Sequence, residues 1–246
     1  MSRVKYDLHL HSCLSPCGDD EMTPNNLVNM AALLGYQMIA LTDHNTCGNT
    51  AAAVAAGRQA GILVIPGMEL TTEEEAHVVC LFPTVEQAMG FDELVTSRRQ
   101  KIVNKPEIFG HQYLMDEEDN RIGEKEFLLL NASDISVNEV KKLTAAFEGT
   151  AFPAHVDKDS YSVIASLGAI PPEAGFRAAE VSRRADLHRL LGTNPELKEL
   201  LLLRNSDAHY LENMPDPSAW LELAELTPAY LIACLNGMEK TVGAWE

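Results

Sequence analysis

Short β-type runs and helical runs follow one another along most of this chain. Predicted strands cover residues 4–11, 37–43, 62–70, 76–82, 150–156, 176–182 and 201–209. Predicted helices cover residues 23–35, 49–61, 85–103, 135–149, 160–168, 194–200 and 228–238. A chain of this kind buries its strands in a sheet covered by the helices, so the order predicts a largely parallel α/β architecture.

Residues 104 to about 148 interrupt this alternation. Residues 115–127 are rich in charged side chains and predict a turn or a hairpin. We interpret the stretch at about 104–148 as a small insertion and not as a separately folding domain. Because 246 residues can bury one sizeable core, we expect a single domain over residues 1–246.

Composition predicts the environment of the protein. No apolar run reaches the roughly 18 residues that a membrane span requires, and the N-terminal residues 1–12 have no apolar stretch of signal-peptide type. We therefore expect no membrane association and a cytoplasmic location. Five cysteines, an odd number, favour reduced thiols or a metal ligand over a disulfide framework.

The formal net charge of the chain is −17. This charge argues against long nucleic acid as a partner, because binding to a phosphate backbone needs clustered Lys and Arg. A small anionic substrate is compatible with an acidic chain, since bound metal ions can reverse the local field. The composition makes no prediction of oligomeric state.

The positions of the histidines point to a function. Six of the eight lie at or just past the C-terminal ends of predicted strands. These six are His9, His11, His44, His77, His155 and His209. In β/α barrels that end of the strands forms the active site, so the six positions predict a shared metal site.

The motifs DLHLHS and LTDHN supply the first candidate ligands. Side chains at i and i+2 of a strand project to the same face, so His9 and His11 can bind one ion together. Asp7 lies one step deeper on that face and is suited to accept a hydrogen bond from an imidazole N–H. Asp43 and His44 are adjacent and point opposite ways in an extended chain, which favours His44 as the ligand and leaves Asp43 to orient a neighbour.

The motifs PGMEL, PAHVDKD and NSDAH add further ligands. Glu69 ends an apolar strand, where a carboxylate is costly unless it is paired or metal-bound. It can bridge two ions, and His77 is placed to complete the second. His155 adds another imidazole, and Asp207 and His209 stand at i and i+2.

The number and type of these ligands predict a multinuclear site. Eight candidate ligands are too many for one tetrahedral ion and imply two or three divalent ions. Mixed nitrogen and oxygen donors favour Zn, Mn or Fe over Ca.

The motifs, taken in order, resemble those of the PHP family, the polymerase and histidinol phosphatase superfamily. They run from residue 7 to residue 209. The resemblance implies a distorted (β/α)7 barrel, up to three metal ions and phosphoesterase activity. The ligands that it implies are His9, His11, Glu69 and Asp207 for the first ion; Glu69, His77 and His155 for the second; and His44, His209 and one residue of the loop after His11 for the third.

The loop SCLSPCGDD departs from the common pattern of the family. Cys17 lies six residues after His11, where some relatives place a histidine ligand. A thiolate at Cys17 would favour Zn or Fe in the third site. Asp19 or Asp20 is the alternative loop ligand.

The predicted reaction is hydrolysis of a phosphomonoester or small nucleotide by a metal-activated hydroxide at a di- or trinuclear site. Asp207 is a candidate to accept a proton from the bridging water, and either His209 or a metal-bound water is a candidate general acid. Arg183 and Lys158, just past predicted strands, are candidates for holding the phosphate.

Other functions stay open on the sequence alone. A metallohydrolase acting on an amide-type bond would use the same metals. A non-catalytic metal-binding or regulatory module would instead close every coordination position. A nuclease acting on mono- or oligonucleotides is a variant of the phosphoesterase hypothesis.

Overall fold

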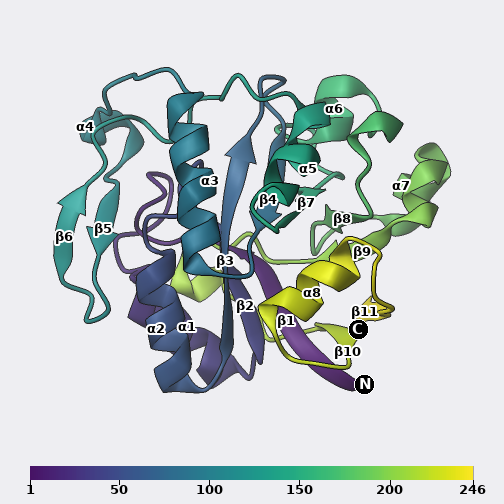
Figure 1. Ribbon diagram of the computed structural model, residues 1–246, viewed down its shortest axis with the longest axis horizontal. Helices are drawn as coiled ribbons and strands as arrows, with labels where there is room; N and C mark the ends of the chain where they lie inside the picture. The colour runs from purple at the N-terminus through teal and green to yellow at the C-terminus, as the bar shows by residue number, and fades with distance from the viewer. Residues whose placement is uncertain (246) are drawn as a thin grey trace.

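The computed structural model describes residues 1–245. Its strands are β1 (Ser2–Leu10), β2 (Met38–Leu41), β3 (Leu63–Thr71), β4 (His77–Leu81), β5 (Tyr113–Met115), β6 (Arg121–Glu124), β7 (Thr150–Pro153), β8 (Ala178–Val181), β9 (Leu201–Arg204), β10 (Ala219–Leu223) and β11 (Gly243–Trp245). Its α-helices are α1 (Pro24–Leu34), α2 (Thr50–Ala60), α3 (Val85–Ser97), α4 (Pro106–Phe109), α5 (Val137–Ala145), α6 (Val163–Leu167), α7 (Leu187–Thr193) and α8 (Pro228–Leu235). Figure 1 shows the β5–β6 hairpin at one edge of the molecule and α7 at the other.

A seven-stranded sheet in the order β11-β10-β1-β2-β3-β4-β7 forms the scaffold. Parallel pairing joins β1 to β2 and β2 to β3, as the sequence predicts. β4 departs from that expectation, because it pairs antiparallel with both β3 and β7. The five residues 72–76 between β3 and β4 are too few for the crossover that a parallel pair needs.

The parallel pair β8 and β9 closes the curled sheet into a distorted barrel. The Val156 N–H, after β7, donates to the Glu180 carbonyl of β8 at 2.9 Å, and the Asp207 N–H, after β9, donates to the His9 carbonyl of β1 at 3.0 Å. One apolar cluster draws side chains from β1, β2, β3, β4, β7, β8 and β9. The predicted α/β class is confirmed, and so is the predicted distorted (β/α)7 barrel.

The first helix shows how local sequence sets the element boundaries. The Thr23 side chain accepts from the Asn26 N–H, and Pro24 occupies the first turn, where its missing N–H costs nothing. Gly35 ends α1 in the left-handed conformation with φ of 89°, which glycine adopts without strain. The predicted start and end of this helix are therefore confirmed.

Several further segments differ from the sequence expectation, among them the unpredicted α7 and a 3-10 helix over Pro195–Glu199 in place of the helix predicted over 194–200. The helix predicted over 85–103 ends at Ser97, and beyond it Arg99 and Val103 form β-bridges to Ser133 and Phe127. Strands β10 and β11 were not predicted. In the structure, alternate residues of β10 are buried, as expected of a strand with one face on the core.

Residues 104–148 contain α4, the β5–β6 hairpin and α5. The hairpin, from Tyr113 to Glu124, overlaps the polar stretch 115–127 for which the sequence predicts a turn or hairpin. Helix α5 is not peripheral, because Val137 and Val140 are fully buried in the largest apolar cluster. The description of this segment as an insertion within one domain stays a prediction.

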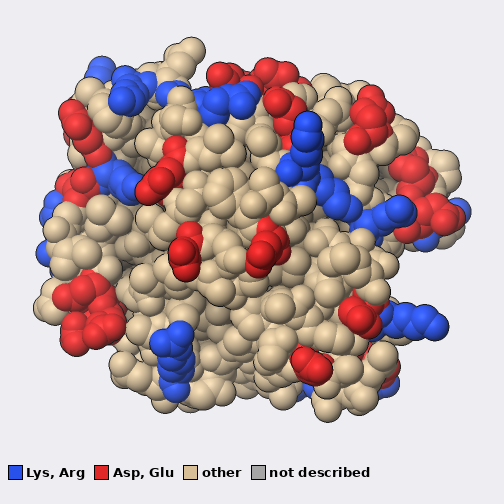
Figure 2. Space-filling view, in the orientation of Figure 1, with Lys and Arg blue, Asp and Glu red and all other residues tan. Residues whose placement is uncertain are grey.

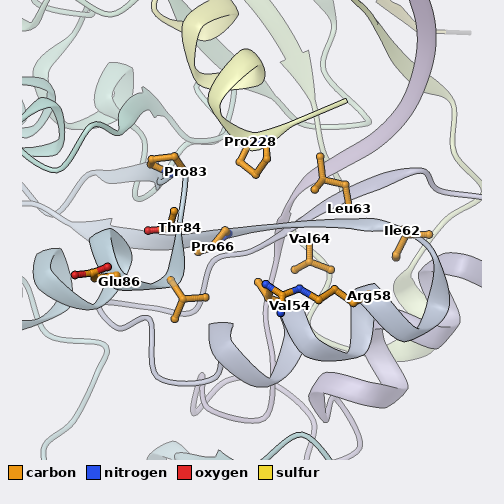
Figure 3. A pocket seen from close by; sticks show the side chains of 11 residues that line it. Val54, Arg58, Ile62, Leu63, Val64, Pro66, Pro83, Thr84, Glu86 and Pro228 are labelled. Atoms are coloured by element: carbon orange, nitrogen blue, oxygen red, sulfur yellow. The ribbon is translucent and has the colours of Figure 1, made fainter. Parts of the chain in front are cut away.

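The face shown in Figure 2 carries acidic and basic side chains interspersed. Among residues 1–245, no helix has the length and apolar character that a membrane crossing requires. A hollow of about 490 Å³ lies between α2, β3 and the first turns of α3 and α8. Its lining is mostly apolar, with Arg58 and Glu86 as the charged members (Figure 3). Four of the six motif histidines, His44, His77, His155 and His209, line a different hollow.

Two helical glycines differ in the room around them and provide a matched test of packing. A Cβ on Gly57 in α2 would lie 2.4 Å from Val64 Cγ2, whereas a Cβ on Gly192 in α7 would meet no atom within 4 Å. We expect Gly57→Ala to lower the free energy of unfolding by about 1–3 kcal/mol, because neighbouring groups must shift. Gly192→Ala should raise it by up to about 1 kcal/mol. Urea titrations measure both, and equal midpoints would contradict this prediction.

Candidate metal centre

The motif residues meet at one edge of the barrel. Parallel strands bring their C-terminal ends to the same edge, and the antiparallel β4 brings its first residue there. His9 and Glu69 lie within β1 and β3, and His77 begins β4. The others lie within five residues of a strand end: His11 after β1, His44 after β2, His155 after β7, and Asp207 and His209 after β9.

The buried carboxylate of Glu69 is the centre of the cluster, with 1% of its side chain exposed. Five imidazole nitrogens lie within 3.3 Å of its oxygens: His77 Nδ1 (2.9 Å), His9 Nε2 (3.2 Å) and His155 Nε2 (3.2 Å) at Oε1, and His44 Nδ1 (3.0 Å) and His11 Nε2 (3.3 Å) at Oε2. The structure thus brings these predicted residues together around one carboxylate.

Asp207 provides a second carboxylate beside the first. Its Oδ1 lies 3.2 Å from His11 Nε2 and 3.5 Å from His9 Nε2. Its Oδ2 accepts a hydrogen bond from Lys158 Nζ at 2.6 Å. The His209 ring stacks on the His11 ring with centroids 4.0 Å apart. Asp207 is thus shared between the histidine cluster and a lysine at its edge.

Three groups of potential ligand atoms overlap in this cluster, and within each group all atoms lie within 4.8 Å of one another. They are His9, His11, Glu69 and Asp207; His44, Glu69 and His77; and His11, His44 and His209. Because the groups share members, their geometry suits several neighbouring ions better than one.

The unsatisfied atoms of the cluster fit a metal as the missing partner. Glu69 Oε2 is buried and lies within 3.3 Å of His44 Nδ1 and His11 Nε2, but neither contact has hydrogen-bond geometry. The buried His155 Nδ1 also has no hydrogen-bond partner. A buried polar atom without a partner is costly, and a bound cation would satisfy the carboxylate oxygen. The donor set of imidazole nitrogen and carboxylate oxygen suits Zn, Mn or Fe.

Glu180 on β8 is a site residue that the sequence analysis missed. Its Oε2 accepts from His9 Nδ1 at 2.9 Å and from Asn205 Nδ2 at 2.8 Å. Its Oε1 accepts from the backbone N–H of His155 at 3.1 Å. A carboxylate behind an imidazole orients the ring and raises its basicity toward a metal. The available signal was a lone glutamate in the otherwise apolar strand AAEV.

Asp7 and Asp43 support the cluster in different ways from one another. Asp7 was expected to accept from an imidazole, but its Oδ1 accepts from the backbone N–H groups of His9 and Ser206 at 3.2 Å each. Asp43 accepts from Ser15 Oγ at 2.7 Å, and Ser15 Oγ lies 3.0 Å from His11 Nδ1. Asp43 therefore orients a neighbour of His11, whereas Asp7 holds backbone.

Burial and neighbouring charges move the pKa values of the cluster apart. Burial lowers the pKa of His44 to about 4 and that of His209 to about 3. Burial also disfavours charged His9, but the nearby carboxylates, Glu180 first, hold its pKa well above the usual value. Burial raises the pKa of Glu69, but the surrounding imidazoles outweigh burial and hold it well below its ordinary value. Glu69 is therefore ionised, as a metal ligand must be.

The cluster opens into a hollow of about 300 Å³. Cys17, Lys158 and Tyr161 line it together with four of the histidines. Cys17 is exposed and belongs to none of the three ligand groups, so its metal role stays a prediction. Asp19 accepts from the Glu21 N–H at 2.8 Å, which turns its carboxylate to local backbone.

The two predicted phosphate contacts separate in the structure. Lys158 is at the mouth of the histidine hollow and 43% exposed. Arg183 instead lines a small hollow beside Asp7, Tyr36 and Arg204 and is not part of the histidine hollow. Only Lys158 therefore reaches the candidate site.

Taken together, the barrel and the cluster define a β/α-barrel protein with a candidate metal centre at one edge of its sheet. The chain belongs to the PHP family, whose PHP domain matches residues 7–164. The matched range contains the motifs from Asp7 to His155, so the resemblance drawn from the motifs is confirmed.

Named relatives match parts of the chain. A 5'-3' exoribonuclease of Haemophilus influenzae is 39% identical over 80 residues, which cover 31% of this chain and 28% of the relative. A 3',5'-nucleoside bisphosphate phosphatase of Chromobacterium violaceum is 37% identical over 73 residues, which cover 30% of this chain and 25% of the relative. Both names denote hydrolases of phosphate esters, the class predicted from the sequence. The aligned segments are only about a quarter of each relative's length.

A solved structure resembles nearly the whole fold. A lesion-specific endonuclease from Pyrococcus furiosus superposes with a TM-score of 0.67 and 17% sequence identity, covering 98% of this chain and 57% of the endonuclease chain. At that identity the likeness concerns the fold alone.

The position of Glu180 behind His9 leads to a prediction for metal binding. Glu180→Gln keeps the shape but removes the charge that supports His9, so we expect metal affinity to fall by about 10–100-fold. Competition with a chelator of known affinity measures this, and Glu173→Gln, at an exposed position, is the control. An affinity unchanged from the wild type would remove Glu180 from the metal centre.

Proposed function

We propose that this protein hydrolyses phosphate esters of small substrates at two or three divalent metal ions held by the Glu69-centred cluster. The observation that carries the proposal is the set of five imidazole nitrogens around one buried carboxylate. Membership of the PHP family supports a phosphate ester over an amide as the bond attacked. The names of both sequence relatives point the same way.

The proposed ligands follow the predicted grouping. They are His9, His11, Glu69 and Asp207 for one ion; Glu69, His77 and His155 for a second; and His44 and His209 for a third, with Cys17 or, alternatively, Asp19 or Asp20. When bound, such ions supply activated water and neutralise charge on the phosphoryl oxygens. Zn, Mn and Fe each suit this donor set.

The residues around the ions have separate proposed roles. We assign the role of proton acceptor to Asp207 Oδ1, while Lys158 Nζ donates a hydrogen bond to its Oδ2. The ammonium group of Lys158 faces the hollow and is suited to hold a phosphoryl oxygen. Because burial lowers the pKa of His209 to about 3, His209 is neutral and better suited to ligation than to proton donation.

Small substrates fit the site better than long polymers. The net charge of −17 opposes binding to an extended phosphate backbone, and a hollow of about 300 Å³ has the volume of a small-molecule site. Because one sequence relative is named an exoribonuclease, short oligonucleotides belong among the substrates to be tested.

The decisive experiment combines metal analysis with a substrate panel. Protein purified without chelator is analysed for metals and then assayed on phosphomonoesters, mononucleotides, short oligonucleotides and amides. We expect hydrolysis of the phosphate esters that is lost on chelation and restored by Zn, Mn or Fe. Turnover of amides alone would establish the amidohydrolase alternative. Metal uptake without turnover of any substrate would favour the non-catalytic module.

Removal of one central imidazole should abolish metal binding and catalysis together. In His9→Ala we expect loss of bound metal and a fall in turnover of more than about 100-fold, because even partners outside the metal shell typically contribute 10–100-fold. His188→Ala, an exposed change on α7, is the control. Full turnover in His9→Ala would count heavily against the proposal.

Lys158 gives a test of phosphate binding that leaves the proposed ligands in place. Lys158→Gln should raise KM for phosphomonoesters by about 10-fold, since a hydrogen bond to a charged group is lost. Metal content should not change, and Lys105→Gln, an exposed substitution before α4, is the control. Loss of metal with an unchanged KM would mean that Lys158 serves Asp207 and not the substrate.

A further inference from the structure

We propose that Tyr161 binds the base of a nucleotide substrate by ring stacking beside the metal centre. This inference rests on the proposed phosphoester hydrolysis and specifies its substrate class. Tyr161 lies in the loop between β7 and α6, three residues after Lys158. The loop thus places a cation and an aromatic ring on the same rim of the site.

Tyr161 stands between two neighbouring hollows. It lines the histidine hollow of about 300 Å³ and also an adjoining hollow of about 330 Å³ that includes Glu75 and Ser166. Leu130 adds an apolar side chain to the first of these. A substrate whose phosphate lies by Asp207 and Lys158 would extend past this ring on leaving the cluster.

The ring is fixed on one side and open on the other. It stacks on the His77 imidazole with centroids 5.0 Å apart and an interplanar angle of 19°. Tyr161 is nevertheless 55% exposed, whereas a large aromatic side chain usually buries most of its surface. The contact with His77 sets the distance of the ring from the cluster, and the exposed surface is free to stack with a second flat ring.

The backbone of Tyr161 has an unfavourable conformation that contacts with β4 maintain. Its φ is 55°, in the left-handed region, where a bulky residue is a genuine outlier. The Tyr161 carbonyl accepts from the His77 N–H at 2.8 Å, which ties the loop to the start of β4. Such strain persists where surrounding structure enforces it and is concentrated at binding sites.

Stacking on Tyr161 would strengthen the binding of substrates that carry a nucleobase. An aromatic side chain stacks with any nucleobase, because every base has a π-face. A sugar phosphate without a base would reach the same metals and Lys158 but would not contact the ring. Tyr161 should therefore select nucleotides over other phosphomonoesters with little preference among the four bases.

The test uses two substrates that differ only in the base, adenosine 5'-monophosphate and ribose 5-phosphate. We expect the wild type to prefer the nucleotide in kcat/KM by at least about fivefold, the lower end for one base stacked on an aromatic ring. Tyr161→Phe keeps the ring and should keep the preference. Tyr161→Asn removes the ring, tolerates positive φ, and should bring the ratio to about one. Rates are normalised to bound metal, so that loss of metal through a disturbed His77 is not mistaken for loss of base binding.

A binding measurement distinguishes failure of this inference from failure of the proposed function. Saturation-transfer NMR compares adenosine with ribose, neither of which carries a phosphate ester. Adenosine binding that is lost in Tyr161→Asn and kept in Tyr161→Phe would support the stacking site even if no phosphate ester were hydrolysed. Phosphoester hydrolysis without a base preference, or an equal preference in Tyr161→Asn, would overturn the inference.

Discussion

The contact between the buried Glu69 carboxylate and the surrounding imidazoles is the interaction on which the rest of the structure depends. An ionised carboxylate away from water is stable only among compensating charges and hydrogen bonds, and Glu69 has five imidazole nitrogens within 3.3 Å. Its backbone is equally constrained, since its N–H donates to the Thr42 carbonyl and its carbonyl accepts from the Asn45 N–H. One residue thereby ties β2, β3 and the histidine cluster together.

The barrel brings residues from several strands and loops to the Glu69 cluster. β8 supplies Glu180 behind His9, and the loop after β1 supplies Ser15 between His11 and Asp43. Strands are stiff elements, so ligands attached at their ends keep their relative positions. A cluster held in this way needs little reorganisation to take up an ion.

Much of the architecture could be predicted because its signals are local. The capping residues Thr23 and Gly35 identify α1, and the i and i+2 spacing of His9 and His11 places both rings on one side of β1. The direction of β4 was not predicted, although the five-residue connection from β3 carries that information. Strands β10 and β11, which extend the sheet at its edge, were also not predicted.

Side-chain partners were less predictable than backbone. Asp7 has the spacing expected of an imidazole partner, yet it accepts from backbone N–H groups, and Glu180, from β8, takes the predicted role behind His9. Arg183 follows β8 as Lys158 follows β7, but only Lys158 lines the site. Sequence position places a residue at an end of a strand without stating which way its side chain turns.

The sequence by itself determined the barrel class, the family and the set of candidate ligands, because spacing along a strand and alternation of strand and helix are properties of the local chain. The tertiary structure decided which of those residues meet. Closure through β8 and β9 brings Asp207 within 3.2 Å of His11, although 196 positions separate them. It also set Tyr161 on His77 and left Arg183 outside. Such contacts depend on the twist and closure of the whole sheet, and no short segment encodes either.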